Sequence, residues 1–484
     1  MKKEYLILAL ILFVIFLFRL PSLFEPFWYG DEGIFAAVAN NLNHGGILYQ
    51  TAWDNKPPMI YLTYAAIFKS FGVSMFWLRL ITMVIVLSTA SVIYEIAQKV
   101  LGTKRALVAS FIFGFLTSLR IVEGNLALTE IFMILPIALA MLLAIKRNFD
   151  LPSLFGAGFL LAIASLYKQV GALEAAALGL FLFLTSENFG EFIKRGVALS
   201  VGFFFPYLII LAYFAPKKLV GEYIFAAYTY YRIYLGESPR YALLINILKF
   251  LPILTVLGLG LWKKIKKEVS VFDLFLLWTA FSFLGSYFSG RTYGHYLVQA
   301  IPPLSLLLAS ITFKPRLTYI RLGFAVFFFV PLIFLTKLLF TDFLSGGPIN
   351  QVKYWQNFIE LGTGKKSVDQ YNNFFDSNVN QIMGLSDFLR NQGAFGKNVY
   401  IWGDYPWLYA IANLKDPTKY VTSFHVFGVP DGKREVIDAL SGNYPVYIIK
   451  PPASIGYFLE LEKFISRNYK RIGKIEDTEV FAKK

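Results

Sequence analysis

Long apolar runs, separated by short loops that carry lysine and arginine, constrain the fold of this 484-residue chain most strongly. A helix needs roughly 20 apolar residues to cross the hydrocarbon core of a bilayer. We predict about eleven such spans, over 4–24, 74–98, 106–120, 126–145, 152–168, 170–186, 196–216, 241–262, 270–289, 295–313 and 318–340. Only 16% of the residues are charged, against about 25% in soluble domains. The fold class is therefore an α-helical polytopic membrane protein.

The distribution of basic residues predicts the orientation of these spans. With the N-terminus inside, the inner loops hold 16 Lys and Arg residues and the short outer loops hold nine. Basic residues prefer cytoplasmic loops, and the cluster at 263–267 carries the strongest signal. The net charge of +15 is thus explained by topology, and we expect no nucleic-acid partner. The first apolar run is too long for a signal peptide, and we expect it to be retained.

The chain changes character near residue 345. The runs at 398–403, 444–450 and 478–483 have the composition of strands, and 378–391, 432–442 and 454–468 have helical spacing. The segment 345–377 is predicted to be a linker or ordered loop. We predict a transmembrane catalytic domain over 1–344, with a long outer loop at 25–73, and a small extracytoplasmic α/β domain over 345–484.

Ionisable and polar residues gather on the outer side of the predicted spans. They are Asp31, Glu32, His44, Asp54, Lys56, Glu123, Glu130, Lys168, Arg291, Tyr293, His295 and Tyr296. Each kind of residue in this set also has a purely structural interpretation. A loop pair of acids can be merely solvated, a lysine before prolines can snorkel, a carboxylate and a lysine can form a structural ion pair, and tyrosines can belong to the aromatic belt. Together they favour a site for a phosphorylated lipid, in which cations hold phosphate and an acid removes a proton.

Five motifs, taken in order, resemble the membrane glycosyltransferases of the GT-C superfamily. The likeness is strongest to the protein O-mannosyltransferase and aminoarabinose transferase group. The motifs are GDE at 30–32, DNKPP at 54–58, NLALTE at 125–130, SLYKQ at 165–169 and RTYGHYLVQAIPPLSLLLA at 291–309. Two departures from the family pattern concern three positions. Glu130 stands where relatives usually carry Asp, and Gln169-Val170 replaces small residues.

The resemblance implies an inverting transfer from a sugar carried on a polyprenyl phosphate. It implies Asp31, Glu32 and Glu130 as catalytic residues, and Lys56, Lys168 and Arg291 as cations for the donor phosphate. Asp54, Tyr293, His295 and Tyr296 complete the expected site. The acceptor, which is a glycan, a lipid or a protein, stays open. No cofactor is certain. Asp31, Glu32, Asp54 and His295 are candidate ligands for a divalent metal such as magnesium or manganese.

Two other functions fit a polytopic chain. A transporter or flippase of lipid-linked substrates predicts ionisable groups near the bilayer midplane in broken helices, whereas here they cluster at the outer ends. A non-catalytic receptor or scaffold needs no acid pair and no Lys-Pro loop at the membrane interface. With no cysteine in the sequence, thiol nucleophiles, disulfides and zinc-thiolate sites are excluded.

Overall fold

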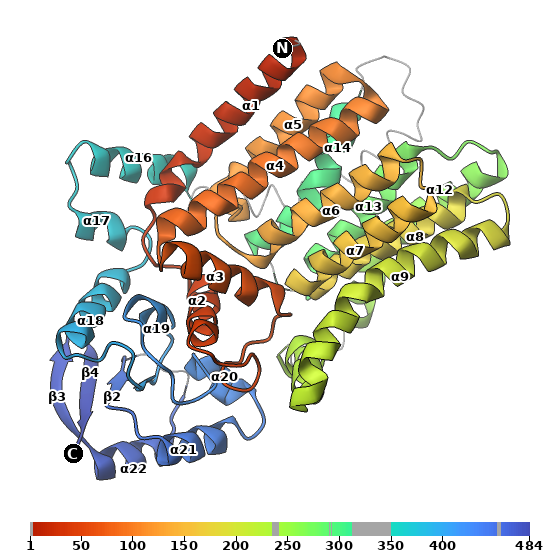
Figure 1. Ribbon diagram of the computed structural model, residues 1–484. Helices are drawn as coiled ribbons and strands as arrows, with labels where there is room; N and C mark the ends of the chain where they lie inside the picture. The colour runs from red at the N-terminus through yellow and green to blue at the C-terminus, as the bar shows by residue number, and fades with distance from the viewer. Residues whose placement is uncertain (1–2, 235–241, 290, 292, 312–349, 453–455) are drawn as a thin grey trace. The chain divides into compact units, whose positions relative to one another are not determined.

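A computed structural model describes residues 3–234, 242–289, 291, 293–311, 350–452 and 456–484 (Figure 1). Contacts between residues divide the chain into two compact units. The first unit comprises residues 1–22, 79–210 and 238–356. The second comprises residues 23–78, 211–237 and 357–484. The predicted domain boundary at 344–345 lies outside the described residues, as does the predicted span 318–340.

The first unit is built from apolar helices that match the other ten predicted spans. They are α1 (Lys3–Arg19), α4 (Met75–Leu101), α5 (Thr103–Ser118), α6 (Thr129–Lys146), α7 (Leu151–Tyr167), α8 (Leu173–Thr185), α9 (Phe189–Phe214), α12 (Ala242–Ile265), α13 (Val271–Tyr287) and α14 (Ile301–Ser310). Short 3-10 turns precede or follow several of them, including η1 (Leu20–Phe24), η2 (Arg120–Val122), η3 (Gln169–Ala172), η4 (Ala215–Lys217) and η6 (Gly294–Ala300). Every predicted span that falls on described residues is thus helical.

Small residues allow these helices to pack closely. Helix α6 lies against α7, α13 against α8, and α14 against α5 (Figure 1). Between α7 and α9, a Cβ atom built on Gly158 would lie 2.1 Å from the carbonyl oxygen of Leu199. A Cβ on Gly202 would lie 2.0 Å from the carbonyl oxygen of Phe155. Small residues at helix crossings are typical of membrane bundles.

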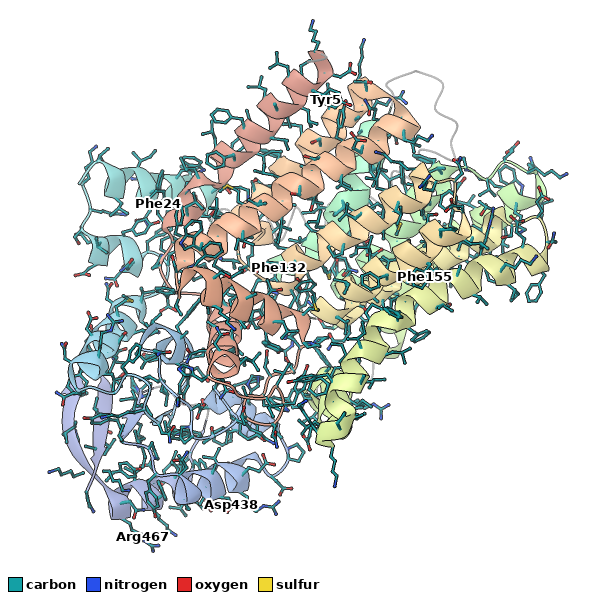
Figure 2. The ribbon with its side chains drawn as sticks, viewed as in Figure 1. Tyr5, Phe24, Phe132, Phe155, Asp438 and Arg467 are labelled. Atoms are coloured by element: carbon teal, nitrogen blue, oxygen red, sulfur yellow. The ribbon has the colours of Figure 1, made fainter. Side chains whose placement is uncertain are left out.

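The helical unit presents apolar side chains both inward and outward. Phe132 on α6 is 2% exposed, whereas Phe155 on α7 is 41% exposed and points outward (Figure 2). On α9, Phe204 and Leu208 are each 61% exposed. By length and composition, four described segments suffice to cross a bilayer, namely Lys3–Phe24, Met75–Leu101, Thr129–Lys146 and Phe189–Lys217. Outward-facing phenylalanine and leucine over such lengths need lipid as solvent, and the chain is a membrane protein.

The predicted break within 152–186 is present. Helix α7 ends at Tyr167, and Lys168 adopts an extended conformation (φ −150°, ψ 131°) before η3 begins. A charged side chain at the end of an apolar helix is costly to bury in hydrocarbon. The segment 152–186 therefore forms two short helices, α7 and α8, and not one long helix.

The second unit combines the predicted outer loop with the C-terminal residues. The loop forms α2 (Gly30–Asn43) and α3 (Met59–Phe71), and residues 211–237 add α10 (Val220–Ile224), η5 (Phe225–Thr229) and α11 (Tyr231–Tyr234). The C-terminal part holds a four-stranded sheet in the order β1-β2-β4-β3. Its strands are β1 (Val399–Ile401), β2 (Tyr447–Lys450), β3 (Tyr469–Ile475) and β4 (Thr478–Lys483). Strand β1 is parallel to β2, and the other pairs are antiparallel.

Helices cover this sheet much as the α/β pattern predicts. They are α17 (Val368–Asn373), α18 (Val379–Asn391), α19 (Trp407–Ile411), α20 (Ser423–Gly428), α21 (Gly432–Gly442) and α22 (Leu459–Asn468). The prediction of a linker or loop over 345–377 is wrong for the described part, because α16 (Gln351–Gly362) and α17 lie there. Tyr354 and Phe358 on α16 stand four residues apart, so its apolar face is narrow and easily overlooked in a polar segment.

Candidate functional site

The two acids of the GDE motif occupy the first turn of α2. Asp31 is partly exposed, and Glu32 is fully buried. Backbone N–H groups at a helix N-terminus stabilise carboxylates placed there. Within the part of the chain that the structure describes, the Asp31 carboxylate accepts no hydrogen bond from the protein. Asp31 is thus the more exposed member of the pair.

The C-terminal residues hold α2 in position. The indole Nε1 of Trp407 donates a hydrogen bond to the carbonyl oxygen of Tyr29 (3.0 Å), which is two residues before Asp31. Trp407 lies so close to α2 that a Cβ on Gly33 would be 2.8 Å from its Cδ1. The Asn40 side-chain amide donates to the carbonyl oxygens of Tyr409 (3.1 Å) and Leu414 (2.8 Å). Helix α2 is therefore fixed at both ends.

Asp54 of the DNKPP motif is a buried carboxylate with two partners. It is 2% exposed, and its Oδ2 accepts a hydrogen bond from the Tyr61 hydroxyl (2.7 Å). Its Oδ1 lies 3.3 Å from Nε2 of His425, whose Nδ1 lies 3.1 Å from the hydroxyl of Thr422. Burial alone raises the pKa of Asp54, but the hydrogen bond from His425 and the charge of Lys56 outweigh it and hold the pKa below its ordinary value. Asp54 is ionised and anchors the loop.

Lys56 follows Asp54 on the same ordered loop. Its backbone N–H donates to the Tyr61 hydroxyl (3.1 Å), and its carbonyl oxygen accepts from the Tyr49 hydroxyl (2.7 Å). The ammonium group donates to Oδ1 of Asn55 (2.8 Å), and the side chain is only partly buried. Pro57 and Pro58 then lead into α3. Lys56 is thus a cation on a rigid backbone, which suits a phosphate contact.

In the helical unit, Glu130 and Lys168 form a buried ion pair. Glu130 lies in the first turn of α6 and is 2% exposed, and the Lys168 ammonium donates to its Oε1. The Thr129 hydroxyl donates to the other carboxylate oxygen (2.8 Å). Nζ of Lys168 also lies 3.7 Å from the centre of the Tyr296 ring, a cation–π contact. The Lys168 ammonium group is therefore held between Glu130 and Tyr296 and is partly shielded from water.

His295 joins this group through Glu123. Nδ1 of His295 lies 2.6 Å from Oε2 of Glu123, and the imidazole meets the Tyr296 ring edge-on at 4.8 Å. Tyr293 stacks on the same imidazole with ring centres 5.5 Å apart. The close approach depends on Gly294, because a Cβ there would lie 1.9 Å from the carbonyl oxygen of Ile121. The RTYGHY motif is thus held against residues 121–123, which directly precede the NLALTE motif.

The helical unit therefore contains a continuous chain of charged and aromatic groups at the start of α6, the end of α7 and η6. Arg291 precedes this chain and is partly buried, and its backbone N–H donates to the hydroxyl of Ser289 (3.3 Å). Across the described residues, no three or more His, Asp or Glu side chains gather in a way that could hold a metal ion. The divalent metal suggested from Asp31, Glu32, Asp54 and His295 stays a prediction.

The overall fold is that of a known class of membrane enzyme. The structure aligns over 100% of this chain, and 98% of the other, with ArnT from Cupriavidus metallidurans bound to undecaprenyl phosphate, at a TM-score of 0.59 and 14% identity. The apo state of ArnT from the same organism matches over 99% of this chain and 97% of that one (TM-score 0.57, 13% identity). The chain has the GT-C fold. The fold class predicted from the sequence is confirmed.

Sequence comparison agrees with this GT-C fold. Residues 55–217 match the family model described as dolichyl-phosphate-mannose-protein mannosyltransferase. An uncharacterised protein of Aquifex aeolicus (strain VF5) is 23% identical over 357 residues, which is 70% of each chain. The resemblance to GT-C membrane glycosyltransferases, inferred from five short motifs, is confirmed by the family match and the fold.

Sequence reasoning missed several residues that contact the candidate site residues within each unit. His425 was not recognised as the partner of Asp54, although it is one of only three histidines in the chain. Glu123 was placed near the fourth span without a partner, and the structure pairs it with His295. Trp407, which contacts α2, follows a predicted strand and belongs to none of the five motifs. The rarity of histidine was the one signal that pointed to His425.

Proposed function

We propose that this protein is an integral membrane glycosyltransferase that moves a sugar from a polyprenyl-phosphate donor to an acceptor, with inversion at the anomeric carbon. The chain-long likeness to ArnT, a protein seen with undecaprenyl phosphate, is the observation that carries this proposal. The mannosyltransferase family match over residues 55–217 supports the reaction class. The sugar is a hexose or a pentose.

The donor phosphate is the leaving group in this proposal. It leaves as an anion and needs cations, not a protonating acid. Lys56, Lys168 and Arg291 are proposed to supply the positive charge. Lys168 is held by Glu130, so an arriving phosphate competes with that carboxylate for the ammonium. Tyr296, Tyr293 and His295 would then line the place where the phosphate and the first sugar lie, and Glu123 fixes the imidazole.

Asp31 is proposed as the general base. A sugar or protein hydroxyl has a pKa far above neutral, so a carboxylate within hydrogen-bond reach assists its attack on the anomeric carbon. Two observations support this role: Asp31 lies partly exposed in the first turn of α2, and its carboxylate has no protein donor among the described residues. Glu32, buried one residue later, orients the turn, and Glu130 assists through Lys168. If the acceptor is itself a phosphate, it is already ionised and Asp31 positions it.

The reaction is proposed to take place on the non-cytoplasmic face. The excess of basic residues in the predicted inner loops, 16 against nine, supports this orientation. The outer loop and the C-terminal domain would then share that face with the acceptor, which is a glycan, a lipid or a protein. Membrane lipids surround the helical unit.

Glycan analysis of a deletion strain tests the proposal. Cells lacking this chain should lose one sugar from a single class of cell-envelope glycan and should accumulate the matching polyprenyl-phosphate sugar. Re-expression of the wild-type chain should restore both, and an Asp31→Asn chain of equal abundance should not. If the protein were a flippase, its deletion would leave the donor lipid accumulated on one side of the membrane. Re-expression of the Asp31→Asn chain would then restore the glycan. Unchanged glycans together with unchanged donor lipid would contradict the proposal.

A further inference from the structure

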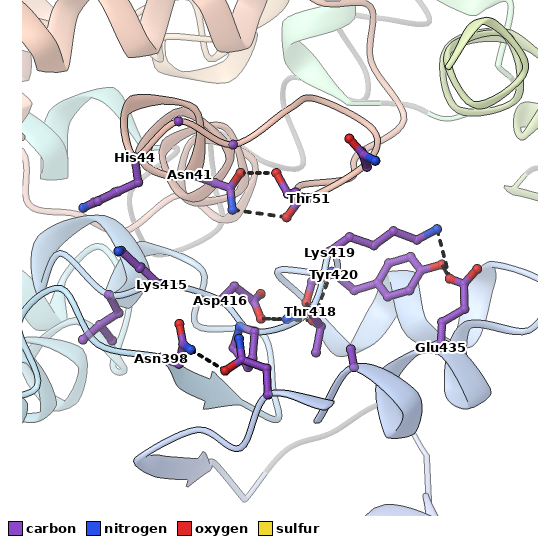
Figure 3. Close-up of a pocket in the computed structure, with 17 residues that line it drawn as sticks. Asn41, His44, Thr51, Asn398, Lys415, Asp416, Thr418, Lys419, Tyr420 and Glu435 are labelled. Carbon is purple, nitrogen blue, oxygen red and sulfur yellow. Dashed lines mark hydrogen bonds and ion pairs between the residues drawn. The ribbon is translucent and has the colours of Figure 1, made fainter. Parts of the chain in front are cut away.

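The second unit contains a pocket that the proposed reaction does not use. It encloses about 510 Å³ between the loop that follows α2 and the segment from Asn398 to Asn443 (Figure 3). Ligand-binding pockets in proteins range from about 300 to 1,000 Å³, so this one has room for a small molecule. All of its lining residues belong to one compact unit.

Six lining side chains both donate and accept hydrogen bonds through an amide or an aliphatic hydroxyl group. They are the amides Asn41, Gln50, Asn398 and Asn443 and the hydroxyls of Thr51 and Thr418. Most small-molecule pockets are largely apolar with a few polar groups. The six amides and hydroxyls add to the apolar part of this lining, and they suit a ligand whose own groups donate and accept hydrogen bonds at many points. Sugar hydroxyls have this property.

These polar side chains are held in place by one another. The Thr51 hydroxyl donates to Oδ1 of Asn41 (2.7 Å), and the Asn41 amide donates to the carbonyl oxygen of Thr51 (3.2 Å) (Figure 3). Across the pocket, the Asn398 amide donates to Oδ1 of Asn443 (2.8 Å). Each amide has two N–H groups and two lone pairs, so every one keeps capacity for a ligand. Pre-ordered side chains lose less entropy when a ligand binds.

The charges around the pocket nearly balance. Lys419 forms an ion pair with Glu435 (3.0 Å), and the Tyr420 hydroxyl donates to the same carboxylate. Lys415 lies on the opposite side near Asp416, and burial raises the pKa of the Asp416 carboxyl to about 7. Lys419 is thus paired, and Lys415 stands beside a carboxyl group that is partly ionised near neutral pH, so the lining carries a small net charge. The balance favours a neutral ligand.

We propose that this pocket binds a neutral saccharide of one or two sugar residues. The inference goes beyond the proposed reaction and does not depend on it. The pocket wall is connected to the Asp54 loop, because the Trp53 N–H donates to the carbonyl oxygen of Lys419 (2.8 Å). A bound saccharide would therefore contact Lys419, whose carbonyl oxygen is hydrogen-bonded to the residue before Asp54. Such a site would recruit a glycan to this face of the protein.

Saccharide titration of the purified full-length chain in lipid nanodiscs tests this proposal. The probes are mannose, maltose, cellobiose, mannobiose and chitobiose. Their binding is measured by saturation-transfer NMR and by calorimetry. Ala439→Phe, on the pocket wall, adds bulk without removing a polar group, and it should weaken binding at least tenfold. Asn443→Ala should weaken it about three- to tenfold, the effect of one lost hydrogen bond. Lys397→Ala, exposed on the same unit and outside the pocket, is the matched control and should change nothing.

Each outcome decides the proposal. Binding of at least one saccharide, lost in Ala439→Phe and kept in Lys397→Ala, supports it. Absence of binding to all probes, or binding that Ala439→Phe leaves unchanged, overturns it. A short acidic peptide and inorganic phosphate are titrated in parallel, and stronger binding of either one also overturns it. Thermal unfolding midpoints of each variant show whether a loss of binding reflects a loss of fold. If Ala439→Phe is unfolded, Asn443→Ala decides.

Discussion

Removing His425 is expected to destabilise the second unit through Asp54. The Asp54 carboxylate is 2% exposed and has His425 and Tyr61 as hydrogen-bonding partners. Removing one partner of a buried ionised carboxylate costs about 3–5 kcal/mol, because the carboxylate charge is left less compensated in the interior. A change of 1 kcal/mol in the free energy of unfolding shifts the thermal unfolding midpoint by about 2–4 °C in a unit of about 150–250 residues. His425→Ala should therefore lower this midpoint by roughly 6–20 °C.

A double-mutant cycle separates this charge effect from lost packing. His425 also contacts Trp53, with ring centres 5.1 Å apart, and this contact is lost in any case. In the Asp54→Asn background no buried charge remains, so His425→Ala should cost about 2 kcal/mol less than in the wild type. His44→Ala, at an exposed histidine of the same unit, is the control and should shift the midpoint by only a few degrees.

The assay is the thermal unfolding of the purified full-length chain, followed by tryptophan fluorescence. Trp53 reports directly on the loop because it touches His425. If His425→Ala and Asp54→Asn lower the midpoint by amounts that simply add, the two side chains are not coupled. The reasoning about the buried pair would then be wrong.

Three further predictions concern topology, donor binding and pH. Reporter fusions at residue 265, the end of α12, and at residue 400, in β1, should report opposite sides of the membrane, and the same side for both would refute the orientation. Lys168→Ala and Arg291→Ala should each weaken binding of a polyprenyl-phosphate sugar, measured by titration in nanodiscs, whereas unchanged affinity in both would remove them from the phosphate site. The Asp416 carboxyl has a folded-state pKa of about 7, above the roughly 3.9 of an unfolded chain, so folding favours its protonated form. Stability should therefore fall as the pH rises from about 4 to 7. Asp416→Asn should show a smaller drop in unfolding midpoint between pH 5 and pH 8, and equal drops in variant and wild type would contradict this.

The helical part of the fold was predictable because hydrocarbon demands long apolar runs. Even the break at Lys168 followed from one charged residue inside such a run. The C-terminal unit was less predictable. Strand β3 was missed because its residues 470–474 are exposed, and so it lacks an apolar pattern. Helix α16 was missed because few aliphatic residues mark its face.

The sequence motifs name the candidate site residues, but most of the contacts between these residues could not be predicted from the sequence. The motifs name Glu130 and Lys168, and the ion pair between them follows from the facing ends of α6 and α7. The pairing of Asp54 with His425 joins positions 371 residues apart, and nothing local in the sequence links them. Gly33 and Gly294 gave no sequence signal, yet each permits a contact that a Cβ would block. Long-range packing fixes these features.

The role of Asp31 is the central claim, and the rate of sugar transfer by the Asp31→Asn chain tests it most directly. The purified variant is reconstituted with the donor lipid and the acceptor identified from the deletion strain, and donor affinity is measured in the same preparation. With a hydroxyl acceptor, the rate should fall by roughly 10²–10⁴, the usual contribution of positioned proton transfer, while donor affinity is largely kept. Transfer at a near wild-type rate by a well-folded Asp31→Asn protein would contradict the assignment of Asp31 as the base.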